Sequence, residues 1–213
     1  MMSTRDLRAL PEIRTLRRLT RSLAMLDAIL SPEWESRYYS FDSHWGPGEL
    51  VASMRNGQGD HWFALFTAGG VVLHGLDHEA PMYRVDDPWP GIFDGLPAAL
   101  SSFVHEPAFD TRNSTFCIWR RADGGAWERG PVRFPPGEDP DGSAGLLCHL
   151  DARPESYRAF AAEYYEVDLP LAAVTAVYGH APLTRELVAA LNPAVSLRDL
   201  GSDVAEIGYP DDA

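Results

Sequence analysis

The densest group of side chains able to do chemistry lies in residues 74–79 (HGLDHE), and Asp60 and His61 occupy the turn before them. Imidazole and carboxylate groups are the usual general acids and bases of enzymes, and imidazole is a common metal ligand. One hypothesis is therefore a metal-dependent or acid–base enzyme. Its active residues would be His61, His74, His78 and Glu79.

The spacing of the two histidines in this segment argues against a shared metal ion. If residues 71–78 form a strand, His74 and His78 lie on one face and Asp77 points to the other. A rise of ~3.3 Å per residue then separates the two imidazoles by about 7 Å, which is too far for easy joint ligation. We therefore predict no metal site and no cofactor, and we interpret the segment as a strand end with hydrogen-bonded histidines and surface acids.

Two of the six tryptophans lie in loops that are rich in glycine and proline. These are Trp45 and Trp89, whereas Trp62 and Trp119 lie in apolar runs typical of a core. An aromatic side chain on a loop either anchors the loop or contacts a partner. The candidate binding residues are Trp45, Asp60, Asp77, His78, Glu79 and Trp89.

Missing motifs exclude several enzyme classes. The chain has no Gly-x-Ser-x-Gly nucleophile elbow and no dinucleotide-binding fingerprint after an expected strand. It cannot form a Gly-Lys-Ser/Thr phosphate loop, because all eighteen basic residues are arginine. We expect Cys117 and Cys148 to be buried small apolar side chains, and Cys148 and His149 to point to opposite faces of a strand rather than form a catalytic pair. Two cysteines form no disulfide framework, so we expect a reducing, cytoplasmic setting.

The first element that must support these residues is a helix over residues 11–30. Pro11 suits its first turn, and Ser31-Pro32 ends it. Its apolar stripe is formed by Leu16, Leu19, Leu23, Leu26 and Leu30. Because the stripe lacks interfacial aromatic residues, we expect it to dock on the rest of the chain rather than on a membrane. A regulatory or scaffolding module that uses this arginine-rich helix to hold a partner is a further hypothesis.

The middle of the chain predicts a mostly antiparallel sheet, because glycine-rich turns at residues 68–70 and 123–125 join apolar runs into β-hairpins. The expected strands are 35–41, 49–54, 62–67, 71–78, 114–121 and 126–129, with 145–150 and 204–207 as further candidates. The expected later helices are 96–104, 154–165, 169–178 and 183–191. The fold class is therefore α+β: hairpin-connected strands with an N-terminal helix and a C-terminal helical run.

The composition predicts a single domain over residues 1–213. The chain is 45% hydrophobic and 23% charged, which suits one globular core and excludes a disordered protein. No run of about 20 apolar residues is present, so we expect no membrane span, and the arginines of residues 1–30 argue against a secretory signal. We expect residues 1–10 to be flexible and residues 130–145, which are rich in Pro, Gly and Asp, to form a mobile loop.

The negative charge is unevenly distributed along the chain. The net charge is −13, and residues 1–30 carry six arginines against Asp6, Glu12 and Asp27, a net of +3, so the remainder carries −16. An acidic body repels phosphate backbones, which argues against nucleic acid as a partner. It suits a basic protein partner, and the sequence leaves the oligomeric state open.

The hairpin region resembles a known bacterial family. The turn Asn56-Gly57-Gln58-Gly59-Asp60 is followed by an apolar strand, a Gly70-Val71 return strand and Asp77-His78-Glu79, and Ser101-Ser102-Phe103-Val104 comes later. Over residues 54–106 this pattern is similar to the SUKH superfamily, often described as the SMI/KNR cell-wall-regulator group. The resemblance implies an immunity protein that neutralises a toxin domain by occupying its active surface.

The whole chain is similar to a group of bacterial proteins of similar length that share two short motifs. These are the Ser-Met-Arg-x-Gly-x-Gly-Asp turn, here residues 53–60, and the Trp-Pro-Gly-Ile-Phe-Asp loop, here residues 89–94. This second resemblance implies no activity. The leading hypothesis is therefore a cytoplasmic, non-enzymatic protein that binds a basic protein partner.

Overall fold

A computed structural model describes residues 2–210 and confirms the α+β fold class. One six-stranded sheet has the strand order β1-β2-β3-β4-β5-β6, and every neighbouring pair is antiparallel. The strands are β1 (Tyr39–Gly46), β2 (Glu49–Arg55), β3 (His61–Thr67), β4 (Gly70–Leu76), β5 (Phe116–Arg121) and β6 (Glu128–Arg129). Short turns join β1 to β4 in sequence order, whereas the long connection from β4 to β5 carries three 3-10 helices before the chain returns beside β4.

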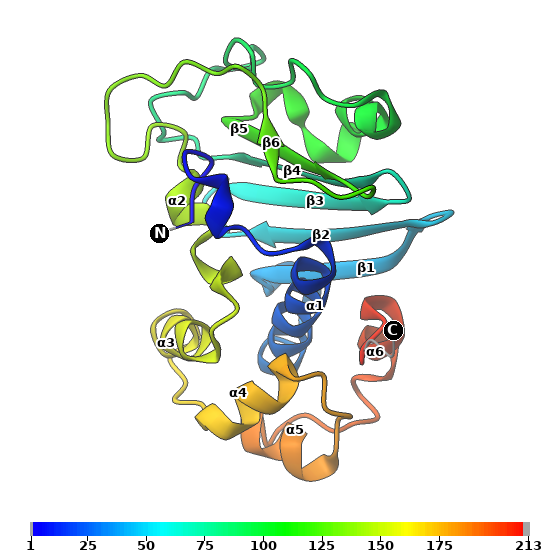
Figure 1. Ribbon diagram of the computed structural model, residues 1–213. Helices are drawn as coiled ribbons and strands as arrows, with labels where there is room; N and C mark the ends of the chain where they lie inside the picture. Colours follow the sequence, from blue (N-terminus) through cyan, green and yellow to red (C-terminus); the bar gives the residue numbers. More distant parts are fainter. Residues whose placement is uncertain (1, 211–213) are drawn as a thin grey trace.

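Most of the α-helices lie on the β1 side of this sheet (Figure 1). The α-helices are α1 (Ile13–Leu30), α2 (Ser143–Leu146), α3 (Pro154–Tyr164), α4 (Leu171–Tyr178), α5 (Arg185–Leu191) and α6 (Gly201–Ile207). The 3-10 helices are η1 (Leu7–Ala9), η2 (Trp34–Ser36), η3 (Ala98–His105), η4 (Pro107–Phe109), η5 (Thr111–Asn113) and η6 (Cys148–Asp151). In Figure 1, α3, α4, α5 and α6 lie on the side of β1, away from β5 and β6.

Helix α1 is part of the core. Its leucine stripe is buried, as the periodicity predicts, except for Leu30, which is partly buried, and the helix packs against β1, α4 and α6. Even one of its arginines is enclosed: Arg21 is 7% exposed, and its guanidinium donates to the carbonyl of Ile207 and lies 4.9 Å from the ring centre of Phe41. The helix therefore docks on the body of the protein.

Two apolar clusters cover the two faces of the sheet. The larger one joins α1 and the C-terminal helices to one face. The smaller one joins the other face to η3 and η4 through Phe103 and Phe109, with Leu65, Val72 and Trp119 below them. The two clusters hold the sheet between a helical layer and a layer of short 3-10 helices.

The outer edge of β1 is occupied by side chains from the helices. The carboxylate of Asp27 on α1 accepts a hydrogen bond from the backbone N–H of Tyr39 at 2.6 Å, and the hydroxyl of Tyr165 accepts from the N–H of Tyr38 at 3.4 Å. Further along, Ser43 donates its hydroxyl proton to the carbonyl of Glu206 at 2.6 Å. Helix side chains and backbone therefore cover this edge strand.

Two candidate strands of the sequence analysis are helical. Residues 145–150 fall in α2 and η6. The carboxylate of Asp139 accepts hydrogen bonds from the N–H groups of Ala144 and Gly145, which stabilises the first turn of α2. Residues 204–207 fall in α6, which ends at Gly208 in the left-handed conformation typical of a helix C-terminus. The expected helix over 96–104 is the 3-10 helix η3, and β1 begins later than expected.

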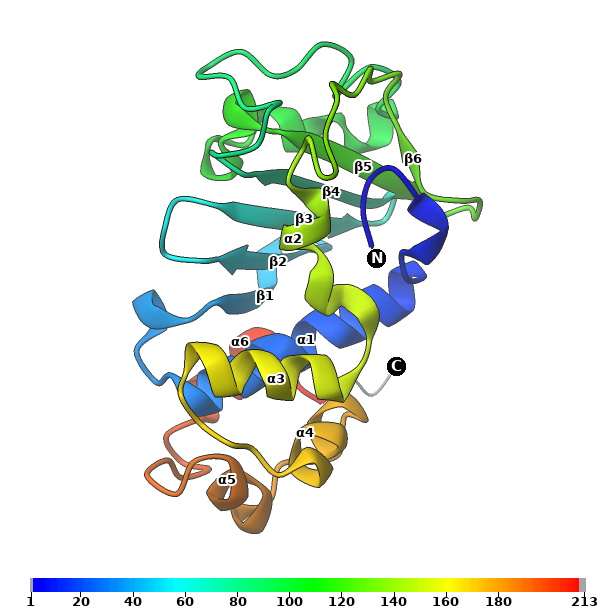
Figure 2. The ribbon, with the colours of Figure 1, turned by 90° about the vertical axis from the view of Figure 1, so that its left-hand side faces the viewer.

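The two segments expected to be flexible pack against each other. Thr4 is buried, its hydroxyl donates to the carboxylate of Asp141, and its N–H donates to the Ser143 hydroxyl at 3.0 Å. Arg5 donates to the carbonyls of Gly137 and Glu138. Figure 2 shows the N-terminal segment beside α2. We name this contact between residues 2–10 and 137–143 the N-terminal strap; residue 1 lies outside the described residues.

None of the helices between residues 2 and 210 is long and apolar enough to pass through a lipid bilayer.

Candidate functional site

His61 and His74 meet on the sheet face that carries the smaller cluster. His74 stands opposite Phe63 on β3 and opposite Cys117 on β5, and the ring centres of His61 and His74 are 6.0 Å apart. His74 is fully buried, its Nδ1 is 2.8 Å from the Ser114 hydroxyl, and burial lowers the pKa of both histidines. Both imidazoles are therefore held in the neutral form near neutral pH.

His78 lies apart from this pair. Strand β4 ends at Leu76, so the alternation that would place His78 beside His74 stops two residues earlier. The Nδ1 of His78 is 2.5 Å from a carboxylate oxygen of Asp60, which also accepts from the His78 N–H at 2.9 Å. The hydrogen bond to Asp60 raises the pKa of His78. Burial alone would raise the pKa of Asp60, but the hydrogen bonds from His78 and Asn56 outweigh burial and hold that pKa below its usual value.

The residues of the enzyme hypothesis thus fall into two groups. His61 and His74 lie inside the sheet layer, whereas His78 and Glu79 lie in the turn after β4. Within residues 2–210, no group of three or more His, Cys, Asp or Glu side chains could hold a metal ion. The geometry brings only two of the four proposed residues together at the sheet.

Carboxylates crowd the turn after β4. Asp77 packs against Gly142, where an added Cβ would lie 2.2 Å from its Oδ2 and where φ is +73°, so this contact requires glycine. Burial raises the pKa of Asp77, and the charges of Asp60 and Asp139 raise it further. We name Asp60, Asp77, Glu79 and Asp139 the acidic end.

Most of the acidic end forms no ion pair with the arginines of residues 2–210. Asp60 is paired with His78, but no ion pair joins Asp77, Glu79 or Asp139 to an arginine of the described chain. The side chain of Glu79 projects into solvent. The arrangement can attract a cation or a basic surface.

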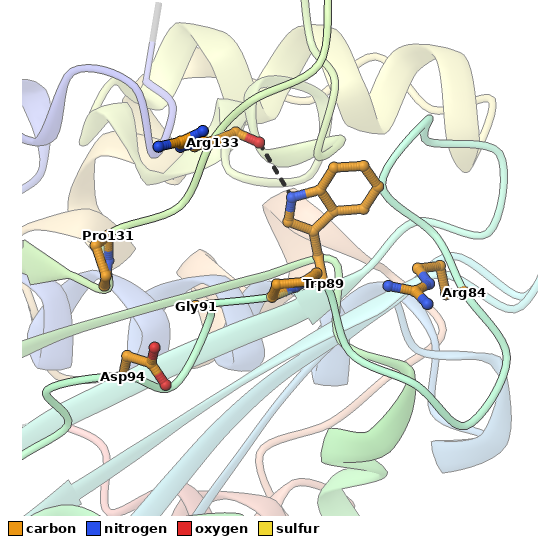
Figure 3. A pocket seen from close by; sticks show the side chains of 7 residues that line it. Arg84, Trp89, Gly91, Asp94, Pro131 and Arg133 are labelled. Carbon is orange, nitrogen blue, oxygen red and sulfur yellow. Dashed lines mark hydrogen bonds between the residues drawn. The ribbon is translucent and has the colours of Figure 1, made fainter.

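Trp89 lines a pocket of about 450 Å³ with Arg84, Gly91, Asp94, Pro131 and Arg133. Its Nε1 donates to the carbonyl of Arg133 at 3.1 Å, which fastens the loop of residues 89–94 to the segment after β6 (Figure 3). In Figure 3 the indole lies between Arg84 and Arg133. The indole N–H of Trp89 therefore anchors its loop.

Trp45 lines a different groove. Its ring stacks on Phe109 with ring centres 5.5 Å apart, and the groove measures about 250 Å³. Trp34, which the sequence analysis did not select, also lines it and is 44% exposed. We name it the Trp34–Trp45 groove. Trp45 lies in β1 rather than in the expected loop, and it lines a different pocket from Trp89; neither of these two pockets includes a residue of the acidic end.

Two further groups were not anticipated from the sequence. Asp27 is completely buried and accepts hydrogen bonds from the hydroxyls of Tyr157 and Tyr165 at 2.6 and 2.8 Å. One sequence pattern could have indicated the burial of Asp27: it lies four residues after Leu23, which places it on the apolar stripe of α1. The other group is the Tyr39 hydroxyl, which lies 2.6 Å from Nδ1 of His149.

The cysteines differ from each other. Cys117 is buried, as expected, and burial raises the pKa of its thiol. Cys148 is exposed, so the expectation of a buried side chain was wrong there, because it begins η6 rather than lying in a strand.

No family model matches the chain, and neither a curated protein nor a solved structure matches it. The resemblance of residues 54–106 to the SUKH superfamily therefore stays a prediction.

Proposed function

We propose that the protein is a non-enzymatic binding protein whose acidic end meets a basic protein surface, and that it neutralises a basic toxin domain in the manner of an immunity protein. The observation that carries the proposal is a group of neighbouring carboxylates without ion pairs: Asp77, Glu79 and Asp139. The resemblance to the SUKH superfamily supports the same role.

Electrostatics favour such a partner. Burial raises the pKa of Asp77, and the charges of Asp60 and Asp139 raise it further, because neighbouring negative charges make its ionised form less stable. A lysine or arginine from a partner would relieve that repulsion. The net charge of −13 extends the attraction beyond the contact, which speeds association with basic proteins and makes it sensitive to salt.

The test begins with the product of the neighbouring gene in the native host. The two proteins are co-purified, and inhibition of the neighbour's toxicity is measured together with the association rate at low and high salt. Glu79→Lys changes an exposed side chain of the acidic end and should slow association about tenfold and weaken its salt dependence.

Glu163→Lys is the matched control, because it makes the same charge change on an exposed position of α3. It should leave association close to that of the unaltered chain. The proposal fails if the neighbouring product neither binds nor is inhibited, or if both variants slow association equally.

A further inference from the structure

The Trp34–Trp45 groove crosses the outer part of the sheet. Its floor includes Ser40 of β1 and Ser53 of β2, which stand directly opposite each other in the strand register. Phe63 of β3 extends the floor, and Trp45 closes one end next to η4. The groove is therefore built on three neighbouring strands, which hold its lining residues in fixed positions.

Both tryptophans are exposed but held in place. Trp34 is 44% exposed and Trp45 is 37% exposed. The guanidinium of Arg55 lies 4.3 Å from the ring centre of Trp34, and Phe109 stacks on Trp45 at an interplanar angle of 21°. Each indole thus keeps a large accessible area while a neighbour fixes its orientation, which lowers the entropy cost of binding a ligand.

Two polar side chains of the groove make no hydrogen bond or ion pair to the described residues. Ser53 is 6% exposed, its hydroxyl makes no hydrogen bond to the described residues, and the residue lines the groove. Arg55 likewise forms no ion pair with any carboxylate of residues 2–210. A ligand in the groove can therefore hydrogen-bond to both side chains without displacing a protein hydrogen-bond partner.

Acceptors lie in the same groove. Asp42 and Glu206 both line it, and burial together with the charge of Asp42 raises the pKa of Glu206. The groove thus offers hydroxyl and guanidinium donors, carboxylate acceptors and two indole surfaces. An anion would be repelled by the carboxylates, a cation would be repelled by Arg55, and a purely apolar ligand would leave Ser53 without a partner.

We propose that the Trp34–Trp45 groove binds a neutral sugar ring. A sugar presents C–H groups to aromatic faces and hydroxyls that both donate and accept hydrogen bonds, which matches this mixed lining. The groove volume of about 250 Å³ is slightly below the roughly 300–1,000 Å³ of sites for drug-sized ligands, so the groove accommodates one ring of a saccharide. This site does not depend on the proposed partner of the acidic end.

The test uses the full chain and saturation-transfer NMR with glucose, galactose, mannose, N-acetylglucosamine and their disaccharides. At least one sugar should receive saturation on its ring C–H protons. Trp45→Ala should weaken its affinity about tenfold or more, because truncating a central aromatic contact has effects of this size. Ser53→Ala keeps both indoles and should weaken binding as well, so the test does not depend on a variant that removes a packed ring.

Trp89→Ala and Glu79→Lys are the controls, because these residues lie outside the groove. Both should bind the sugar as the unaltered chain does, which separates this site from the acidic end. The proposal is overturned if none of the sugars receives saturation, or if Trp45→Ala and Ser53→Ala bind unchanged. It is also overturned if an acetylated hexa-arginine peptide occupies the groove and the sugars do not displace it.

Discussion

Asp27 shows how one buried carboxylate can join three parts of a fold. It lies on α1 and receives hydrogen bonds from Tyr39 at the start of β1, from Tyr157 of α3 and from Tyr165 beyond it. These bonds favour the ionised form, but burial outweighs them and raises the pKa of Asp27 to about 6. The native chain therefore binds a proton here more tightly than the unfolded chain does.

This difference sets the sign of a pH effect on stability. With an ordinary pKa of 3.8 and a native value of about 6, the contribution of Asp27 is greatest below about pH 4 and is lost as the pH rises through 6. The loss amounts to about 3 kcal/mol. The Asp27→Asn variant should not lose this stability, so its free energy of unfolding in urea should lack the corresponding fall between pH 4 and pH 7.

The matched control for that experiment is Asp168→Asn, which changes an exposed carboxylate. Its free energy of unfolding should follow the pH profile of the unaltered chain. Parallel profiles for the unaltered chain and Asp27→Asn would contradict the assignment of this pH dependence to Asp27.

Among the elements, the N-terminal strap makes the clearest prediction. Removing residues 1–10 deletes the bonds from Thr4 to Asp141 and Ser143 and the bonds from Arg5 to the carbonyls of residues 137 and 138. The amides of residues 137–145 should then exchange with solvent at least about tenfold faster, because their local opening costs less free energy. Hydrogen–deuterium exchange by mass spectrometry measures this directly.

The amides of β3 and β4 serve as the internal control for this truncation, because none of the hydrogen bonds removed with Thr4 and Arg5 involves these strands. Unchanged exchange of residues 137–145 would show that the strap does not restrain the loop.

Elements with a local signal could be predicted from the sequence. The hairpins joining β3 to β4 and β5 to β6 follow from glycine-rich turns, and α3 begins at Pro154, where a proline fits the first turn. Helix α6 could not be predicted in this way, because only its packing against β1 and α1 decides its conformation. The contact of Thr4 with Asp141 joins residues 137 positions apart, and no local pattern in the sequence marks it.

The candidate sites show the same limit. The pairing of Asp60 with His78 depends on the chain leaving β4 at Leu76, which no alternation pattern marks. The Trp34–Trp45 groove combines residues from the start of the chain with Glu206 near its end. Such a combination depends on tertiary packing, so Trp34 alone gave no signal in the sequence.

For the whole molecule, α1 decides whether the rest can fold. It packs between β1 and the helices α4 and α6, and twelve of its residues are buried. A chain that lacks residues 1–30 should therefore lose its cooperative thermal unfolding transition and its near-ultraviolet circular dichroism. The chain that lacks only residues 1–10 is the control and should keep both. A cooperative transition without α1 would show that the helix is an accessory element instead.

The covered edge of β1 limits how another protein can approach this one. Many proteins recruit an extended segment by letting it pair, backbone to backbone, with an open strand. Here Asp27 and Tyr165 already take the outward N–H groups at the start of β1, and α6 packs along the same strand. A visiting strand could pair with the start of β1 only by displacing the Asp27 carboxylate and the Tyr165 hydroxyl. At that end of the edge, recognition must instead depend on side chains, so binding there should be selective for the partner's sequence.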